Sequence, residues 1–308
     1  MEYSGVSVKD GPAGALWPTE RRADMVVSEG PNEYVLYMQN DHGDLSGQFA
    51  AHWGNDTFAP LQPRNSMVFV AEAHDNGWWY WDINPEVDDQ GVPITFRRTP
   101  RQRLYEFINK GIDNIMEKDL YAGLIASIHH AGLPQHRYGT LPAVPRRQDE
   151  HTQKFISERE PLNRELISKV ATMKEYDGAN SSDFIWFNYR MMQVFDRLSL
   201  FFCCNYDLEA ATASEPQSQA DKDYGRAFYR TAINSTPVRF GREDVELTLT
   251  PIEKTKLIVD PYPFDESPLK VAVRGRKIPR RTYRTHEEFR EVYRRQPRET
   301  FEYTLVPK

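Results

Sequence analysis

Residues 74–82 read His-Asp-Asn-Gly-Trp-Trp-Tyr-Trp-Asp. The His74-Asp75 doublet ends an apolar run, and Gly77 and a dense aromatic cluster follow it. Adjacent histidine and aspartate side chains can ligate one metal ion from a helix end, because both offer hard or borderline donor atoms. A hydrophobic core alone would not require this pair. The stretch therefore predicts one wall of a metal site, provided that other His and Asp residues converge there.

Long segments on both sides of this stretch repeat apolar residues with a helical period. The predicted helices cover 45–53, 67–75, 101–118, 120–130, 153–174 and 182–204. The last is apolar on nearly every side, which is typical of a helix at the centre of its domain. Shorter segments read as strands instead, at 33–38, 245–249, 269–274 and 303–306. We expect a mainly α fold, a helical bundle with a small C-terminal antiparallel β unit packed on it.

Composition divides the chain into four parts. Gly, Pro and charged residues dominate the first, and large aliphatic residues are scarce in the third. The expected parts are a flexible N-terminal segment (1–30), a helical domain (31–208), a linker or excursion (209–238) and a small β-rich unit (239–308).

Charge and hydropathy exclude several classes of partner. The net charge of −6 argues against a nucleic-acid-binding surface, and no apolar run approaches the roughly 20 residues that cross a bilayer. The N-terminus lacks a signal-peptide pattern, and the neighbouring Cys203 and Cys204 form no disulfide framework. We expect a cytoplasmic protein that acts on a small molecule, without nucleic-acid or membrane partners. Its oligomeric state stays open, with a homodimer as one option.

Asp196 lies in the middle of the most apolar predicted helix. An ionised carboxylate there is costly unless a cation or strong donors meet it. A metal ion would meet that need, and so would an ion pair with Arg197. Both alternatives are open from the residues alone.

The order His42, His74-Asp75, Asp196 over successive helices resembles the HD-domain superfamily of metal-dependent enzymes, in which such residues bind one metal ion on a helical bundle. The resemblance covers roughly residues 40–204 and implies an HD-like fold with these four residues as ligands. Gly77 matches the glycine two residues after the doublet in that superfamily. Trp78 departs from it, because HD hydrolases often carry a lysine or another small or polar residue there, and the class of substrate therefore stays open.

A closer resemblance covers nearly the whole chain and is carried by several short motifs. They are Gln39-Asn-Asp-His42, Trp53-Gly-Asn55, His74-Asp-Asn-Gly-Trp78, Ser127-Ile-His129, Arg137-Tyr-Gly139 and Asp196-Arg-Leu-Ser-Leu200. They look like one bacterial-type family that is known only as a domain of unknown function. This resemblance brings no activity with it.

One metal ion would make the protein a hydrolase that uses a metal-activated water. His129 would then act as general acid or base, and Arg137 or Arg197 would hold an anionic group. Trp78 and Trp81 either line the mouth of a substrate pocket or simply pack the helix end onto the core. The substrate would be a small organic or phosphate-bearing metabolite.

Two metal ions would instead indicate a di-iron oxygenase, since dinuclear HD proteins add two histidines between the doublet and the last aspartate. His129 is one candidate, and the other is His130, His136 or His151, of which His151 has the spacing that fits. A third hypothesis is a non-catalytic protein with a structural His/Asp network. Histidine and carboxylate ligands alone do not distinguish Fe, Mn, Zn and Ni.

Overall fold

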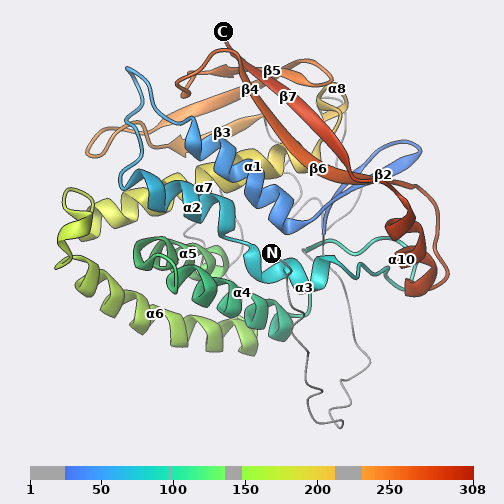
Figure 1. Ribbon diagram of the computed structural model, residues 1–308, viewed down its shortest axis with the longest axis horizontal. Coiled ribbons are helices and arrows are strands. Elements are labelled where there is room, and N and C mark those ends of the chain that lie inside the picture. The colour runs from blue at the N-terminus through green and yellow to red at the C-terminus, as the bar shows by residue number, and fades with distance from the viewer. Residues whose placement is uncertain (1–24, 97–98, 136–147, 212–230) are drawn as a thin grey trace, which may run out of the picture.

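The computed structural model describes residues 25–96, 99–135, 148–211 and 231–308 (Figure 1). Within them, seven strands form one curled, half-barrel sheet in the order β1-β2-β6-β7-β5-β4-β3. The strands are β1 (Val26–Glu29), β2 (Glu33–Tyr37), β3 (Ala232–Thr236), β4 (Val245–Glu253), β5 (Lys256–Asp260), β6 (Leu269–Pro279) and β7 (Glu299–Pro307). Neighbouring strands run antiparallel except β5 and β7, which are parallel.

Helices supply most of the remaining regular structure. The α-helices are α1 (Gln39–Ala51), α2 (Arg64–Ala73), α3 (Trp79–Asp82), α4 (Arg101–Met116), α5 (Leu120–Gly132), α6 (Glu150–Val170), α7 (Ser182–Cys204), α8 (Leu208–Ala211) and α10 (His286–Arg295). Short 3-10 turns are η1 (Asn76–Trp78), η3 (Leu133–Gln135) and η4 (Lys174–Tyr176). Within the described ranges, no helix combines the length and apolar character that a bilayer crossing requires.

The predicted fold class, a mainly α HD-like bundle with a small C-terminal β unit, is wrong. Of the described residues, 49% are helical and 22% are in strands, and the mixed sheet combines strands from both ends of the described chain. The N-terminal hairpin of β1 and β2 joins the C-terminal strands because β2 pairs with β6, with Leu36 opposite Arg276. Pairing between strands more than 200 residues apart in the sequence leaves no local pattern. The C-terminal strand segments therefore looked like a separate, smaller unit.

The expected domain boundaries stay a prediction. Residues 1–24 of the expected flexible segment and residues 212–230 of the expected linker lie outside the described residues. The described remainder of the first segment contains β1, and that of the linker contains β3.

Two layers of helices lie beneath the sheet (Figure 1). α1 and α7 lie directly against it, and α2, α4, α5 and α6 lie farther away. α7 is buried along most of its length, which confirms the prediction of a central helix. Sheet and helices share one large apolar core, so residues from distant strands and helices pack in a continuous interior.

α10 covers the other face of the sheet at the β1-β2-β6 end. Its Phe289 and Tyr293, one turn apart, are buried in a second apolar cluster with Tyr34, Leu36 and Ile278. This helix is not predicted from the sequence, because its other residues are mostly charged and only this pair is buried.

Gln48 of α1 completes the hydrogen bonding along the open edge of β6. Its Nε2 donates to the Ala272 carbonyl oxygen at 2.8 Å, and its Oε1 accepts from the Ala272 amide at 2.9 Å. β2 pairs with β6 only from Arg276 onward, so at Ala272 this carboxamide takes the place of a strand. The contact holds α1, and with it His42, against the sheet.

Gln48→Ala should lower the free energy of unfolding by about 2 kcal/mol, because it removes two hydrogen bonds and leaves two part-buried backbone groups without them. Urea unfolding followed by circular dichroism measures the change. Gln102→Ala serves as the control, since the exposed Gln102 makes one long bond of 3.4 Å to Glu106. Equal unfolding midpoints for the two variants would contradict this role of Gln48.

Candidate metal centre

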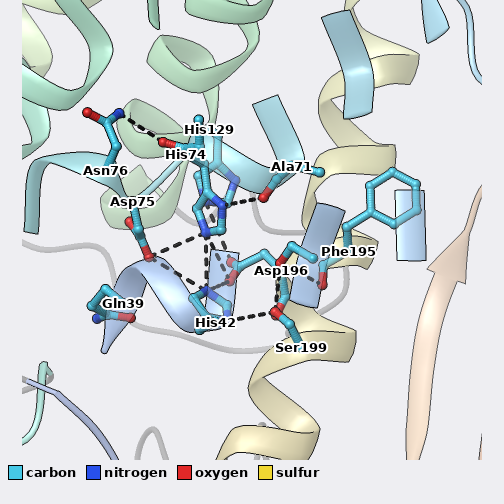
Figure 2. A network of polar contacts seen from close by, with 12 residues as sticks. Gln39, His42, Ala71, His74, Asp75, Asn76, His129, Phe195, Asp196 and Ser199 are labelled. Carbon is cyan, nitrogen blue, oxygen red and sulfur yellow. Dashed lines mark hydrogen bonds and ion pairs between the residues drawn. The ribbon is translucent and has the colours of Figure 1, made fainter. Parts of the chain in front are cut away.

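Four helical elements bring His and Asp side chains to one buried point (Figure 2). His42 lies in the first turn of α1, and Asp196 lies in the middle of α7. His74 and Asp75 follow the last residue of α2, where the chain turns into η1. α5 adds His129 in its last turn.

Small residues allow α1 to approach α2 this closely. A Cβ at Gly43 would overlap the Glu72 carbonyl oxygen, and one at Gly47 would lie 2.8 Å from the Glu72 Cβ. The two glycines are four residues apart and therefore share one helix face. This glycine pair places the His42 ring within reach of the end of α2.

Four ligand-type atoms converge at the centre. The Nε2 atoms of His42 and His74 lie 3.2 Å apart. The Asp196 Oδ1 lies 3.1 Å from the first and 3.6 Å from the second. The Asp75 Oδ2 lies 3.6 Å and 3.3 Å from the same two nitrogens. His42, His74 and Asp196 are all buried and form a group that could hold a metal ion, with their ligand atoms within 4.8 Å of one another.

Backbone geometry fixes the orientation of the His74 ring. Its Nδ1 lies 3.0 Å from the Ala71 carbonyl oxygen. A carbonyl oxygen only accepts, so Nδ1 carries a proton and donates it there. In a neutral His74, Nε2 therefore has no proton, and its lone pair is directed at the centre, as metal ligation requires.

Charge in the centre favours a cation. Burial disfavours a charged imidazole, but Asp75 and Asp196 outweigh this effect and raise the pKa of His74 well above its usual value. Burial also opposes ionisation of Asp75, yet His74, His130 and His42 lower its pKa to about 2. The pKa of Asp196 is likewise held well below its usual range by His42 and His74, against the effect of burial. The buried Asp196 and the partly buried Asp75 thus stay ionised, and their charges attract a cation.

His129 and His130 lie against the outer oxygens of the two carboxylates. The Nε2 of His129 is 3.6 Å from the Asp196 Oδ2, and that of His130 is 3.9 Å from the Asp75 Oδ1. His130 also donates from Nε2 to the His74 carbonyl oxygen at 3.0 Å. Burial lowers the pKa of both rings, that of His129 to about 3. Both imidazoles are therefore neutral at pH 7, and both belong to the buried cluster.

Other predicted site residues are placed elsewhere or are not described. Arg137 and His136 lie outside the described residues. His151 is exposed in the first turn of α6, so it is not part of the buried cluster. Arg197 is buried on α7 directly after Asp196.

The aromatic residues after the doublet pack against α4. Trp78 and Trp81 both contact the Phe107 ring, with centroid separations of 5.9 Å and 5.1 Å. Trp78 is buried, and Trp81 is half-buried with the Arg103 guanidinium over its ring. These contacts anchor the segment that carries His74 and Asp75.

Two serines and one aspartate near the centre were not predicted. Ser199 lies three residues after Asp196, and Ser46 lies four residues after His42, so helical spacing from the ligands could have found both. Asp82 accepts from the Gln39 amide at 2.5 Å and so caps the start of α1. This contact joins residues 43 positions apart, and no local signal marks it.

Comparisons with known proteins identify a family but no activity. The family model DUF3891, described as a protein of unknown function, matches residues 25–280. Curated proteins and solved structures yield no match. The expected resemblance to an uncharacterised family is thereby confirmed, and the chain belongs to the DUF3891 family.

Proposed function

We propose that this protein is a metal-dependent hydrolase, similar to HD-domain enzymes, whose ion is held by His42, His74, Asp75 and Asp196. The observation that carries the proposal is the convergence of two imidazole nitrogens and two ionised carboxylates at separations of 3.1–3.6 Å. Grouping two carboxylates, one buried and one partly buried, is costly unless a cation balances them.

The ligand set fits a divalent transition metal. Imidazole suits Zn, Fe and Ni, while carboxylate also accepts Mn; sites for Ca and Mg are built from oxygen ligands instead. One divalent ion would balance the charges of Asp75 and Asp196, with both histidines neutral. We therefore propose Fe, Mn, Zn or Ni as the bound ion.

When bound, such an ion supplies Lewis-acid activation of water near neutral pH. His129, whose Nε2 lies 3.6 Å from the Asp196 Oδ2, is proposed as the general acid or base of the hydrolysis. Trp78, Trp81 and Arg197 remain proposed pocket residues, with Arg137 proposed to hold an anionic group. The substrate proposed is a small organic or phosphate-bearing molecule, and a cytoplasmic location is proposed with it.

A di-iron oxygenase is a second candidate, favoured by one observation. His129 and His130 add two buried imidazoles next to the carboxylate oxygens that face away from His42 and His74. The exposed position of His151 weighs against the ligand pair expected for that chemistry. Dependence of turnover on O₂ separates the oxygenase from the hydrolase.

Metal analysis of protein purified without chelator, followed by hydrolysis assays, tests the proposal. We expect about one divalent ion per chain and metal-dependent cleavage of p-nitrophenyl phosphate or of a p-nitrophenyl ester. His74→Ala should abolish both. His52→Ala is the matched control, since His52 forms a similar but exposed pair with Asp265 at 3.0 Å.

Other outcomes would decide against hydrolysis. Two irons per chain and O₂-dependent turnover would favour the oxygenase. No bound metal, together with unchanged folding of a His74→Ala/Asp75→Ala double variant, would indicate a structural network and contradict both enzyme proposals.

A further inference from the structure

We propose that Ser199, held in place by Ser46, is a positioning residue that accepts a hydrogen bond from the Nδ1–H of His42 and thereby directs the Nε2 lone pair toward the metal ion. This inference rests on the proposed metal centre. It assigns a role to two fully buried hydroxyl groups that no ligand set includes.

The hydroxyl groups form a short chain that ends on the His42 ring. The Ser199 Oγ lies 2.6 Å from the His42 Nδ1 and 2.7 Å from the Ser46 Oγ. It also lies 3.0 Å from the Asp196 carbonyl oxygen, and the Ser46 Oγ lies 3.3 Å from the Phe195 carbonyl oxygen. Figure 2 shows Ser199 beside the His42 ring, with His74 above that ring.

Counting protons shows how the chain orients His42. Ser199 has one hydroxyl proton, and the Asp196 carbonyl oxygen can only accept it. When Ser199 donates to that carbonyl, its lone pairs accept from the His42 Nδ1 and from Ser46. Every hydroxyl proton then has an acceptor. The His42 Nε2 carries no proton in this arrangement, and its lone pair faces His74 and Asp196.

A hydroxyl differs from the carbonyl that orients His74. The Ala71 carbonyl oxygen can only accept, so it holds His74 in one tautomer. The Ser199 hydroxyl can rotate and donate to Nδ1 instead, in which case Nε2 carries the proton and donates to the Asp196 Oδ1 at 3.1 Å. His42 can therefore stay hydrogen-bonded in the metal-free centre and still present a lone pair when an ion binds.

The choice of a neutral acceptor also suits the charge of the centre. A ligating histidine often donates to a second carboxylate. Here a further carboxylate would add a third carboxylate charge beside Asp75 and Asp196, whose side chains are largely buried. The serine pair orients the ring without adding that charge.

Zinc binding by the full chain and its variants tests this role. After chelator treatment, the zinc affinity is measured by competition with a chromogenic chelator. Ser199→Ala should bind zinc about 10- to 100-fold more weakly, the loss typical of removing an outer partner of a ligand. Ser46→Ala should show a smaller loss in the same direction. Ser66→Ala is the control, because its buried hydroxyl bonds to Asp119 and not to a ligand.

Nitrogen-15 spectra of the imidazoles in the zinc-loaded protein give a second test. A general packing defect would not change the His42 signal alone. We expect a protonated, slowly exchanging Nδ1 on both His42 and His74 in the wild type. Ser199→Ala should accelerate proton exchange at His42 while leaving His74 unchanged.

Three results would overturn the inference. Wild-type zinc affinity in Ser199→Ala, with an unchanged His42 signal, would overturn it while leaving the metal centre intact. If Ser199→Ala does not fold, the same two readings in Ser46→Ala would overturn it. Failure of the wild type to bind zinc or any other divalent ion would overturn both the proposed function and this inference.

Discussion

Replacing Asp196 with asparagine should lower the affinity for a divalent ion by about 100-fold or more, since even outer partners of a ligand are worth 10- to 100-fold. Asp196 supplies the carboxylate oxygen nearest to the His42 Nε2, at 3.1 Å. Asparagine keeps the shape of the side chain but removes its negative charge. The fold should survive, because His74 keeps Asp75 as a charged partner 3.3 Å away.

Isothermal titration with Zn²⁺ or Mn²⁺ measures this loss, and far-ultraviolet circular dichroism checks the fold. Asp44→Asn is the matched control, because Asp44 lies on α1 two residues after His42 and outside the group of ligand atoms. Equal affinity of Asp196→Asn and Asp44→Asn would show that the buried carboxylate does not ligate the ion.

Gly77→Ala should destabilise the protein by about 3 kcal/mol, the upper range for overpacking a core, and should also abolish metal binding. A Cβ at Gly77 would overlap the Phe107 carbonyl oxygen and lie 3.1 Å from the Gly111 amide nitrogen. Both are backbone atoms of α4, so neither can rotate away. Either α4 or the segment from His74 to Trp78 must shift, and a shift of this segment displaces two ligands.

Chemical denaturation measures the stability change, and zinc titration measures the binding. Gly241→Ala is a useful comparison, because a Cβ there meets nothing within 4 Å and only its positive φ of 76° opposes the substitution. It should cost about 1 kcal/mol and leave zinc binding intact. A Gly77→Ala variant as stable as Gly241→Ala would contradict the tight approach of η1 to α4.

The sequence predicted the long helices and the four converging side chains well. The stripe at 101–118 became α4 (Arg101–Met116), and the apolar run at 182–204 became α7. The order of His42, His74-Asp75 and Asp196 located the centre, because buried carboxylates in apolar helices require a compensating partner. The resemblance to an uncharacterised family was also confirmed, whereas the resemblance to the HD-domain superfamily stays a prediction.

The start of α1 was predicted incorrectly for a physical reason. Asp44 resembles an N-cap, but the helix begins at Gln39, after Met38, which makes no side-chain cap. The carboxylate at this helix end comes from Asp82 of α3, which bonds to the Gln39 amide. A cap supplied from a distant segment leaves no local pattern, and His42 therefore lies in the first helical turn rather than before it.

The architecture could not be predicted from local patterns. Apolar and polar residues alternate along a strand only where one face of the sheet is exposed. β2 is buried on both faces, because α10 packs on its outer side. The parallel pair of β5 and β7 and the pairing of β2 with β6 depend on contacts between distant segments. Most of the predicted helices are present in the structure, but the predicted arrangement of helices and strands was wrong.

Anomalous diffraction at the zinc edge, from crystals of the zinc-loaded protein, tests the central claim most directly. We predict one strong peak among His42, His74, Asp75 and Asp196, about 2.0–2.2 Å from both Nε2 atoms and from carboxylate oxygens. A peak only at a surface pair such as His52 and Asp265, or a centre without a peak in protein that binds zinc elsewhere, would contradict it.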